Sequence, residues 1–280
     1  MNKKSLIVFL LLLVTIKAYC QRTNEYQVYA LKVEDAGISA VKDIAVGAVA
    51  SDSVRGSYMF WLLKGAGGRN ILVDTGYLDS TKVGNSSYVR PDQLLKRMNI
   101  SPSEISDVII THCHHDHVGG ISLFPKATFW IQKAEYDYYV GEAWQEKGFS
   151  KGFNRTDIHN LVDINLQGRL KMVNGDSIEI IPGIRVFTGS SHTKGSQYLL
   201  VNSNTKAGKV LLASDASWFN YNLNHLLPIP VYTFDPVTYV AAMKRMKTLM
   251  PDGDYRISGH DDIIFTKFPK VCEGVVRIDR

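Results

Sequence analysis

The ten residues THCHHDHVGG, from Thr111 to Gly120, constrain this chain more than any other stretch. Four of the eight histidines in the 280-residue chain lie between His112 and His117, together with Asp116. The apolar run ISDVIIT, residues 105–111, precedes them and predicts a buried strand that ends where the histidines begin. Because a solvated polar loop needs no histidine, the cluster indicates a chemical site built at the end of a strand.

The order of these residues predicts metal binding. Neutral imidazole and carboxylate both offer a lone pair to a divalent cation near neutral pH. Side chains alternate sides along an extended chain, so His112 and His114 face one way and can hold one metal ion. Asp116 and His117 follow as the chain turns through two glycines, and they can face an adjacent point. The pattern His-x-His-x-Asp-His therefore predicts two adjoining metal positions.

Further ligands must come from elsewhere, because each metal needs three or four. By the same alternation Cys113 and His115 point away from the metals. We expect Cys113 to be a small buried residue and His115 to lie at the surface or beside the ligands. Three candidates stand at predicted strand ends: His192 in GSSHTKGSQ, Asp215 in LLASDAS and His260 in RISGHDD. Each alone would be an ordinary hydrogen-bonded or capping residue, but together they complete the set.

The rest of the chain alternates between strand and helix patterns. EYQVYALKVE and DIAVGAVA predict strands, and residues 57–76 predict a hairpin around GAGG. RPDQLLKRMNI and DPVTYVAAMKRMKTLM predict helices, and AEYDYYVGEAWQEKGF predicts a helix and a lid. Residues 171–192 and 196–217 predict further strands and a second hairpin. Sheets early and late, with helices between them, predict two mixed β-sheets packed together and covered by helices in one domain.

Residues 1–20 predict a secretory signal peptide. Two lysines precede an apolar run from Leu6 to Ile16, which is too short to span a bilayer comfortably. Ala18 and Cys20 have the −3 and −1 spacing of a signal-peptidase site, so we expect cleavage before Gln21. The expected product is an exported domain over residues 21–280, periplasmic or secreted, without stable membrane association. A lipid anchor on Cys20 is the alternative, and the bulky tyrosine before it disfavours that reading.

Charge and cysteine content exclude other classes of partner and fold. Without the three lysines of the signal peptide, the chain has 29 basic and 27 acidic residues, so no nucleic-acid partner is expected. Hydrophobic residues make up 45% of the chain, enough for a sizeable core. Cys113 and Cys272 would form at most one disulfide, which is no disulfide framework. His159 and His225 have no metal-binding context and are expected at the surface.

These features together resemble the metallo-β-lactamase superfamily. ILVDTG, VIITHCHHDHVGG, SSHTKGSQ, LLASDAS and ISGHDD carry the resemblance over almost the whole mature chain. It implies an α+β fold, the αβ/βα sandwich, in which two mixed β-sheets are flanked by helices and metals bind in a cleft at one edge. It also implies two Zn²⁺ ions per chain: one held by His112, His114 and His192, the other by Asp116, His117 and His260, with Asp215 bridging both and Asp74 orienting a ligand imidazole.

Several residues indicate which branch the chain resembles. An acid at Asp215, where one β-lactamase subclass has a nearby cysteine, favours the lactonase, glyoxalase and phosphodiesterase branches. His114 stands where oxygen-reducing di-iron members carry glutamate. The twenty residues after His260 are fewer than glyoxalase II-like thioesterases use. FPKATFWIQKAEYDYY, SDAS and FDPVTYVAAMKRMKTLM followed by SGHD resemble the N-acyl homoserine lactonases.

The resemblance implies a zinc-dependent hydrolase that opens the lactone ring of N-acyl homoserine lactones, a quorum-quenching activity on a small-molecule substrate. A hydroxide bridging the metals would attack the carbonyl, and Asp116 would pass the proton to the leaving alkoxide. Many such lactonases have a tyrosine three residues after the bridging aspartate. Here Trp218 takes that position, so either Tyr221 substitutes for it or the metals alone polarise the substrate. Aromatic residues around Tyr58–Trp61 and Tyr136–Trp144 are candidates for the acyl groove.

Two other functions remain open from the sequence. A different hydrolase of the same fold would act on another lactone, a thioester, a phosphodiester or a β-lactam with the same metal centre. A non-catalytic metal-binding protein on this scaffold would typically have lost one or more ligands, and all seven positions are filled here.

Overall fold

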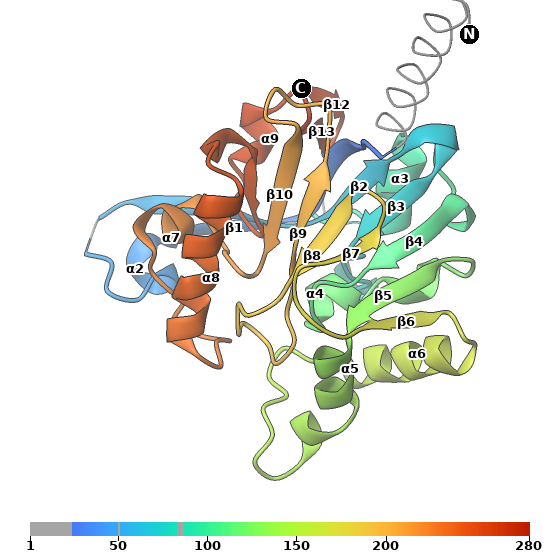
Figure 1. Ribbon diagram of the computed structural model, residues 1–280, viewed down its shortest axis with the longest axis horizontal. Coiled ribbons are helices and arrows are strands. Elements are labelled where there is room, and N and C mark those ends of the chain that lie inside the picture. The colour runs from blue at the N-terminus through green and yellow to red at the C-terminus, as the bar shows by residue number, and fades with distance from the viewer. Residues whose placement is uncertain (1–23, 50, 83, 85–86) are drawn as a thin grey trace, which may run out of the picture.

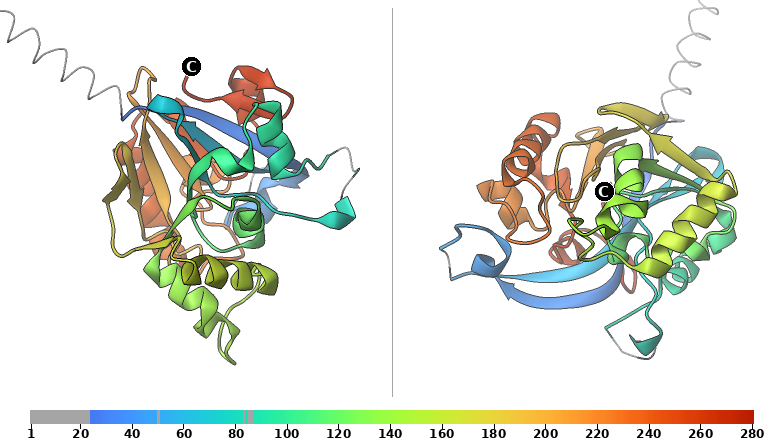
Figure 2. Two further views of the ribbon diagram at one scale, coloured as in Figure 1. Left: turned by 90° about the vertical axis from the view of Figure 1, so that its right-hand side faces the viewer. Right: turned by 90° about the horizontal axis from the view of Figure 1, so that it is seen from below.

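Strands from both halves of the chain form two β-sheets that pack face to face (Figure 1). The computed structural model describes residues 24–280 except 50, 83, 85 and 86. The predicted signal peptide and its cleavage site lie outside the described residues and stay predictions. Helices cover the outer face of each sheet, so the layers run helix, sheet, sheet, helix (Figure 2). The predicted αβ/βα sandwich is confirmed.

The first sheet has eight strands in the order β12-β13-β1-β2-β3-β4-β5-β6. It is antiparallel from β12 to β3 and parallel from β3 to β6. Along β1, Val28 and Ala30 face the core between the sheets, whereas Tyr29 and Leu31 face the covering helices. The strands are β1 (Gln27–Ala40), β2 (Ser53–Lys64), β3 (Asn70–Val73), β4 (Ile105–Ile109), β5 (Thr128–Gln132), β6 (Leu170–Val173), β12 (Lys270–Cys272) and β13 (Val275–Arg277).

The second sheet has five strands in the order β11-β10-β9-β8-β7. β10 and β11 run parallel, and the other neighbours are antiparallel. Val186 and Leu212 of this sheet lie in the same buried cluster as Trp61 of β2. The strands are β7 (Ile178–Ile181), β8 (Ile184–Phe187), β9 (Tyr198–Asn202), β10 (Lys209–Ser214) and β11 (Arg256–Ser258). Both predicted hairpins, β2–β3 and β9–β10, are confirmed.

The covering helices begin at residues that suit a helix start. The carboxylate of Asp235 accepts hydrogen bonds from the backbone N–H groups of Val237 and Thr238 and so caps α8. Pro91 occupies the first turn of α3. The helices are α2 (Val41–Ile44), α3 (Pro91–Arg97), α4 (His115–Val118), α5 (Lys133–Val140), α6 (Arg155–Leu166), α7 (Asn220–His225), α8 (Pro236–Leu249) and α9 (Ile264–Lys267). Single 3₁₀ turns are at Ala66–Gly68, Ser80–Lys82, Pro102–Glu104, Ile121–Leu123, Glu142–Trp144 and Gly253–Tyr255.

The strand predicted over DIAVGAVA is wrong. This segment contains the end of α2 and then a turn, in which Gly47 has a φ of +83°. Ile44 and Ala45 leave the sheet and pack against Phe219 beside α7 (Figure 1). Ile44 and Ala45 are buried, whereas Val46 and Val49 are exposed, so the β-branched content of this segment did not indicate a strand.

Two further elements differ from expectation. β1 continues to Ala40, beyond the predicted end near Glu34, and pairs with β2 as far as Ser53. α5 confirms the helix predicted in AEYDYYVGEAWQEKGF but ends at Val140, and its Tyr136 and Tyr139 are buried against the first sheet. Within the described part of the chain, none of the helices has the length and apolar character that crossing a membrane requires.

Candidate metal centre

The histidine segment leaves the end of β4 and turns at once into the short helix α4. His114 has extended backbone (φ −65°, ψ 150°) and precedes the helix, whereas Asp116 and His117 lie within it. This change of backbone turns neighbouring residues towards two adjacent points. The glycines that follow allow a close approach, because a Cβ at Gly120 would lie 2.4 Å from the carbonyl oxygen of Thr75.

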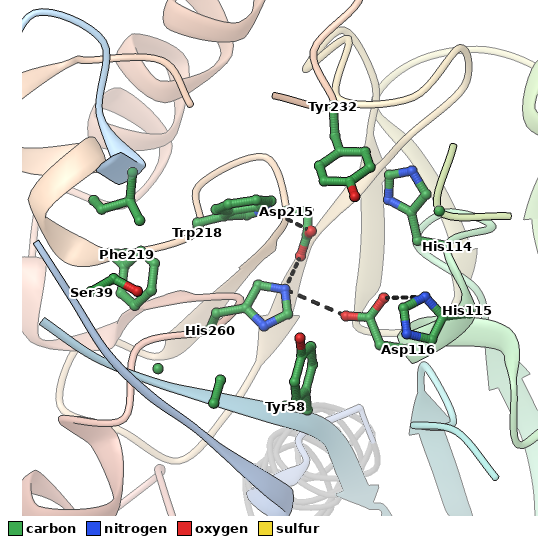
Figure 3. Close-up of a pocket in the computed structure, with 14 residues that line it drawn as sticks. Ser39, Tyr58, His114, His115, Asp116, Asp215, Trp218, Phe219, Tyr232 and His260 are labelled. Atoms are coloured by element: carbon green, nitrogen blue, oxygen red, sulfur yellow. Dashed lines mark hydrogen bonds and ion pairs between the residues drawn. The ribbon is translucent and has the colours of Figure 1, made fainter. Parts of the chain in front are cut away.

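All seven predicted ligands lie together where strands of both sheets end. Figure 3 shows four of them, His114, Asp116, Asp215 and His260, around one pocket. They come from the segment after β4, the loop between β8 and β9, and the loops after β10 and β11. Within each of two groups, the potential ligand atoms lie within 4.8 Å of one another, and six of the seven residues are buried. The first group is His112, His114, His192 and Asp215, and the second is Asp116, His117 and His260. These groups can hold divalent metal, and each residue's role as a ligand stays a prediction.

Asp215 lies between the two groups and presents one oxygen to each. Its Oδ2 is 3.1 Å from His192 Nε2 and 3.7 Å from His112 Nε2. Its Oδ1 is 3.0 Å from His260 Nε2 and 3.3 Å from His117 Nε2. A carboxylate with an oxygen facing each group could be shared by two cations.

The spacing of the imidazole nitrogens and the unpaired buried atoms at the centre are those expected of a cation-binding site. His114 Nδ1 is 3.0 Å from both His112 Nε2 and His192 Nε2, and a single proton can serve only one of these contacts. Nitrogen ligands of a tetrahedral zinc ion lie about 3.3 Å apart, given zinc–nitrogen bonds of about 2 Å. Among the described residues, His117 Nε2 and Asp215 Oδ1 are buried side-chain atoms without a hydrogen-bond partner. A cation between the groups would satisfy both atoms.

Asp74 holds the histidine segment against β3. Its Oδ1 accepts a hydrogen bond from the backbone N–H of Thr111 at 2.8 Å. Its Oδ2 accepts from the hydroxyl of Thr111 at 2.8 Å and lies 2.7 Å from His117 Nδ1. A proton on Nδ1 leaves the lone pair of Nε2 to face Asp116 and Asp215. Asp74 therefore makes the contact that the resemblance implied for it.

His260 is oriented by the backbone of β2. Its Nδ1 is 3.1 Å from the carbonyl oxygen of Ser57, and the N–H of Ser57 donates to the carbonyl oxygen of His260 at 2.9 Å. With the Nδ1 proton directed at Ser57, the Nε2 lone pair faces Asp215. Sequence analysis missed this partner because a backbone carbonyl carries no side-chain signal.

Glu135, in the first turn of α5, joins the histidine segment to the loop between β8 and β9. Its side chain is fully buried. Oε1 accepts from the N–H of Cys113 at 2.8 Å, and Oε2 accepts from the N–H of Gly195 at 2.8 Å and the hydroxyl of Thr193 at 2.9 Å. Burial raises the pKa of Glu135, and these hydrogen bonds oppose the rise. One carboxylate thus sets the spacing between His192 and the ligands of the other sheet.

We expect Glu135→Gln to weaken metal binding by about 10- to 100-fold. Whichever way the amide faces, its NH₂ group meets a backbone N–H, so a buried donor loses its acceptor. Competition with a chromophoric chelator measures the affinity. Glu142→Gln, an exposed position beyond the same helix, is the matched control. An unchanged affinity in Glu135→Gln would show that the two loops keep their spacing without this carboxylate.

The electrostatics of the centre favour the metal-binding protonation state of two carboxylates and two imidazoles. Against the effect of burial, Asp116 and Asp215 raise the pKa of His117 and His260. Burial would raise the pKa of Asp116 and Asp215, but the imidazoles packed around them hold both pKa values below their usual range. Burial, assisted by neighbouring imidazoles, holds the pKa of His112 and His114 well below the ordinary value. Near neutral pH the carboxylates are therefore anionic and these two imidazoles keep free lone pairs.

A pocket of about 250 Å³ opens in front of the centre. Tyr58 and Tyr232 approach the carboxylates of Asp116 and Asp215 from opposite sides (Figure 3). Apolar side chains line the other end, among them those of Ala36, Ile44, Trp218 and Phe219. The pocket therefore places hydroxyl groups beside the charged centre and a hydrocarbon wall farther from it.

The structure corrects the expectation for the missing tyrosine. Tyr221 does not line the pocket; its ring packs on that of His225, with the centroids 4.3 Å apart. The helix α7 begins at Asn220 and turns Tyr221 away from the centre. Trp218 does line the pocket, but its Nε1–H donates to Asp215 Oδ2 at 2.7 Å. Sequence analysis missed Tyr232, because its loop, PIPVYTFD, carries no catalytic motif.

The remaining histidines and cysteines lie as expected. Cys113 is buried, and Cys113 and Cys272 are both free thiols. His159 and His225 are exposed. The side chain of His115 is half exposed, and its Nδ1 lies 3.8 Å from Asp116 Oδ1.

Comparisons with known proteins agree with this geometry. Residues 55–260 match the family model for the metallo-beta-lactamase superfamily. An N-acyl homoserine lactonase from Bacillus sp is 31% identical over 208 residues, which cover 68% of this chain and 76% of the relative. Another from Bacillus cereus is 31% identical over 60% of each chain. The N-acyl homoserine lactonase AttM from Azorhizobium caulinodans is 28% identical over 63% of this chain and 65% of its own length.

Solved structures show the same fold. A quorum-quenching N-acyl homoserine lactone lactonase superposes with a TM-score of 0.67 at 22% identity, over 91% of this chain and 99% of its own. AidC, a dizinc quorum-quenching lactonase in complex with a product, superposes with a TM-score of 0.64 at 16% identity, over 92% of this chain and 98% of its own.

Proposed function

This chain belongs to the metallo-beta-lactamase superfamily, and we propose that it is a metal-dependent hydrolase that opens the lactone ring of N-acyl homoserine lactones. The observation that carries the proposal is the complete set of seven potential ligands, gathered in two groups around a carboxylate that faces both. The likeness to curated lactonases, of which the chain spans 60 to 76% of the length, supports the substrate class. Such an activity destroys a diffusible signal and is quorum quenching.

We propose two zinc ions as the cofactor. Imidazole and carboxylate ligands suit zinc, and the related fold of AidC is that of a dizinc lactonase. His112, His114 and His192 would hold one ion, Asp116, His117 and His260 the other, and Asp215 both. When bound, such ions lower the pKa of water and polarise a carbonyl oxygen, which supplies both partners of an ester hydrolysis.

Asp116 is the residue best placed to move the proton. It lines the pocket, and its Oδ1 lies on the side of the half-exposed His115. Asp215 is less able to accept a proton, since its Oδ2 already accepts a hydrogen bond from the indole N–H of Trp218. A water oxygen bonds to the lactone carbonyl carbon, and the proton that it loses passes to Asp116. As the ring carbon–oxygen bond breaks, Asp116 returns that proton to the departing oxygen, which becomes a hydroxyl. The new carboxylic acid keeps the second proton of the water and then releases it to solvent, leaving a carboxylate.

The apolar wall of the pocket suits the acyl chain. Ala36, Ile44 and Phe219 place hydrocarbon beside the end of the pocket remote from Asp116. Tyr58 lines the pocket, whereas Trp61 is fully buried in the core between the sheets. Of the aromatic segments suggested from sequence, the first contributes Tyr58, and no residue of Tyr136–Trp144 lines this pocket. Ala36 comes from β1, Ile44 from α2 and Phe219 from the segment after β10.

A side-by-side assay of the purified mature protein tests the function. Acyl homoserine lactones, a β-lactam, S-lactoylglutathione and a phosphodiester are compared at equal enzyme and zinc concentration. We expect ring opening of the lactones to exceed every other rate by at least about 100-fold, because the pocket pairs an ester-hydrolysing centre with an apolar wall. A dominant rate on another substrate would assign the chain to a different hydrolase branch. Full metal content without any turnover would favour a metal-binding protein.

A further inference from the structure

Tyr232 has an unusual backbone for a bulky residue. Its φ is +54°, in the left-handed region that L residues disfavour, so its surroundings must hold it there. A backbone hydrogen bond two residues later runs from the N–H of Phe234 to the carbonyl oxygen of Ser191, at 2.7 Å, and ties the loop to the residue before His192. Such strained positions are concentrated at functional sites.

The ring of Tyr232 is packed against the metal centre. Its centroid lies 5.2 Å from that of His114 in an edge-to-face contact, and Lys151 Nζ lies 4.9 Å from it. Figure 3 shows its hydroxyl directed into the space beside Asp215. Among the described residues, no hydrogen-bond partner is found for this hydroxyl. A strained backbone therefore presents a free donor to the place where a substrate must react.

Two other side-chain donors, those of Trp218 and Tyr58, lie near the centre. The indole N–H of Trp218 is bonded to Asp215. Tyr58 is wedged between the rings of Tyr77 and His260. Figure 3 shows the hydroxyl of Tyr58 directed towards Asp116 and His260, on the side of the pocket opposite Tyr232. Tyr232 is the donor that faces the open pocket from the side of the first ligand group.

We propose that Tyr232 is a substrate-binding residue whose hydroxyl donates a hydrogen bond to the oxygen of the carbonyl under attack. The identity of that carbonyl as a lactone rests on the proposed function. Negative charge grows on this oxygen during the reaction, and a fixed donor gains strength as it does. The hydroxyl acts as a donor only, so no proton is transferred from it.

Tyr232→Phe removes the hydroxyl and keeps the ring against His114 and Lys151. We expect kcat/KM to fall by about 100-fold, mainly through kcat, with zinc content unchanged. The fall should be equal for an acyl homoserine lactone and for γ-butyrolactone, because the second has no carbonyl other than that of the ring. Tyr221→Phe, a tyrosine outside the pocket, is the matched control and should stay within about twofold of the unmodified protein.

A binding measurement complements the rates. Titration calorimetry with a ring-opened acyl homoserine should show about tenfold weaker binding to Tyr232→Phe, since the new carboxylate loses a donor. Rates within about twofold of the unmodified protein on both lactones would overturn the proposal. A rise in KM confined to acyl homoserine lactones would also overturn it, because the hydroxyl would then bind the acyl amide.

Failure of the proposed function is distinguishable from failure of this proposal. If the unmodified protein hydrolyses an aryl acetate ester but no lactone, the lactonase assignment fails. Tyr232→Phe is then compared with the unmodified protein on that ester, whose reacting carbonyl meets the same donor. A drop of about 100-fold supports the role of Tyr232, and equal rates overturn it.

Discussion

Replacing Asp215 with asparagine should abolish hydrolysis and release at least one of two metal ions. Each oxygen of Asp215 faces a different group of imidazoles, at 3.1 Å from His192 and 3.0 Å from His260. An amide offers one oxygen, and its NH₂ group cannot bind a cation. The donor Trp218 needs an acceptor at Oδ2, so the NH₂ group would turn towards His260 and His117. The second group then loses its shared ligand.

We expect kcat/KM to fall by at least about 1,000-fold, which corresponds to about 4 kcal/mol of transition-state stabilisation. Metal per chain is measured by atomic emission after gel filtration, and should fall from two towards one. Asp163→Asn, on the exposed face of α6, is the matched control and should keep both the rate and the metal. Two firmly held ions and full activity in Asp215→Asn would contradict a bridging role.

Removing metal with a chelator should eliminate activity and destabilise the fold. Without cations, several imidazoles and two carboxylates are held together in a buried space, and His117 Nε2 and Asp215 Oδ1 have no hydrogen-bond partner among the described residues. A metal at about a thousandfold excess over its dissociation constant stabilises the native state by about 4 kcal/mol. For a chain of this size, its loss should lower the melting temperature by about 8–16 °C.

Differential scanning calorimetry before and after dialysis against a chelator measures this shift, and added zinc should restore both melting temperature and rate. The Asp215→Asn protein provides an internal comparison, because it binds less metal and should show a smaller chelator-induced shift. Unchanged melting and unchanged turnover after verified metal removal would show that neither the fold nor the reaction depends on the centre.

Much of the centre was predictable because its chemistry lies in residue types. His112, His114, Asp116 and His117 are close in sequence, and the strand before them limits where they point. His192 had no local signal and became a candidate only with Asp215 and His260. The structure brings all of these residues together. Ligand candidates can be recognised from sequence because few side chains offer a lone pair to a cation near neutral pH.

The errors share a physical cause. The segment DIAVGAVA has β-forming composition, but Ile44 and Ala45 pack against Phe219, and the N–H of Val46 donates to the carbonyl oxygen of Pro228. Tyr221 is close enough to Asp215 in sequence to be a candidate for the pocket, but α7 begins at Asn220 and directs the side chain of Tyr221 away from the metal centre. Local composition indicates which secondary structure a segment favours. Tertiary contacts decide which secondary structure forms and which side chains face the site.

The sequence by itself determined which atoms can bind metal, because lone pairs belong to side chains whose identity is read directly. Only the tertiary structure decided which interactions orient the ligand atoms and which side chains line the substrate pocket. The carboxylate of Glu135 grips backbone groups of two distant loops, the carbonyl of Ser57 orients His260, and a left-handed backbone at Tyr232 directs a hydroxyl into the pocket. These interactions depend on backbone groups that are far apart in the chain, so they cannot be predicted from a pattern of residue types.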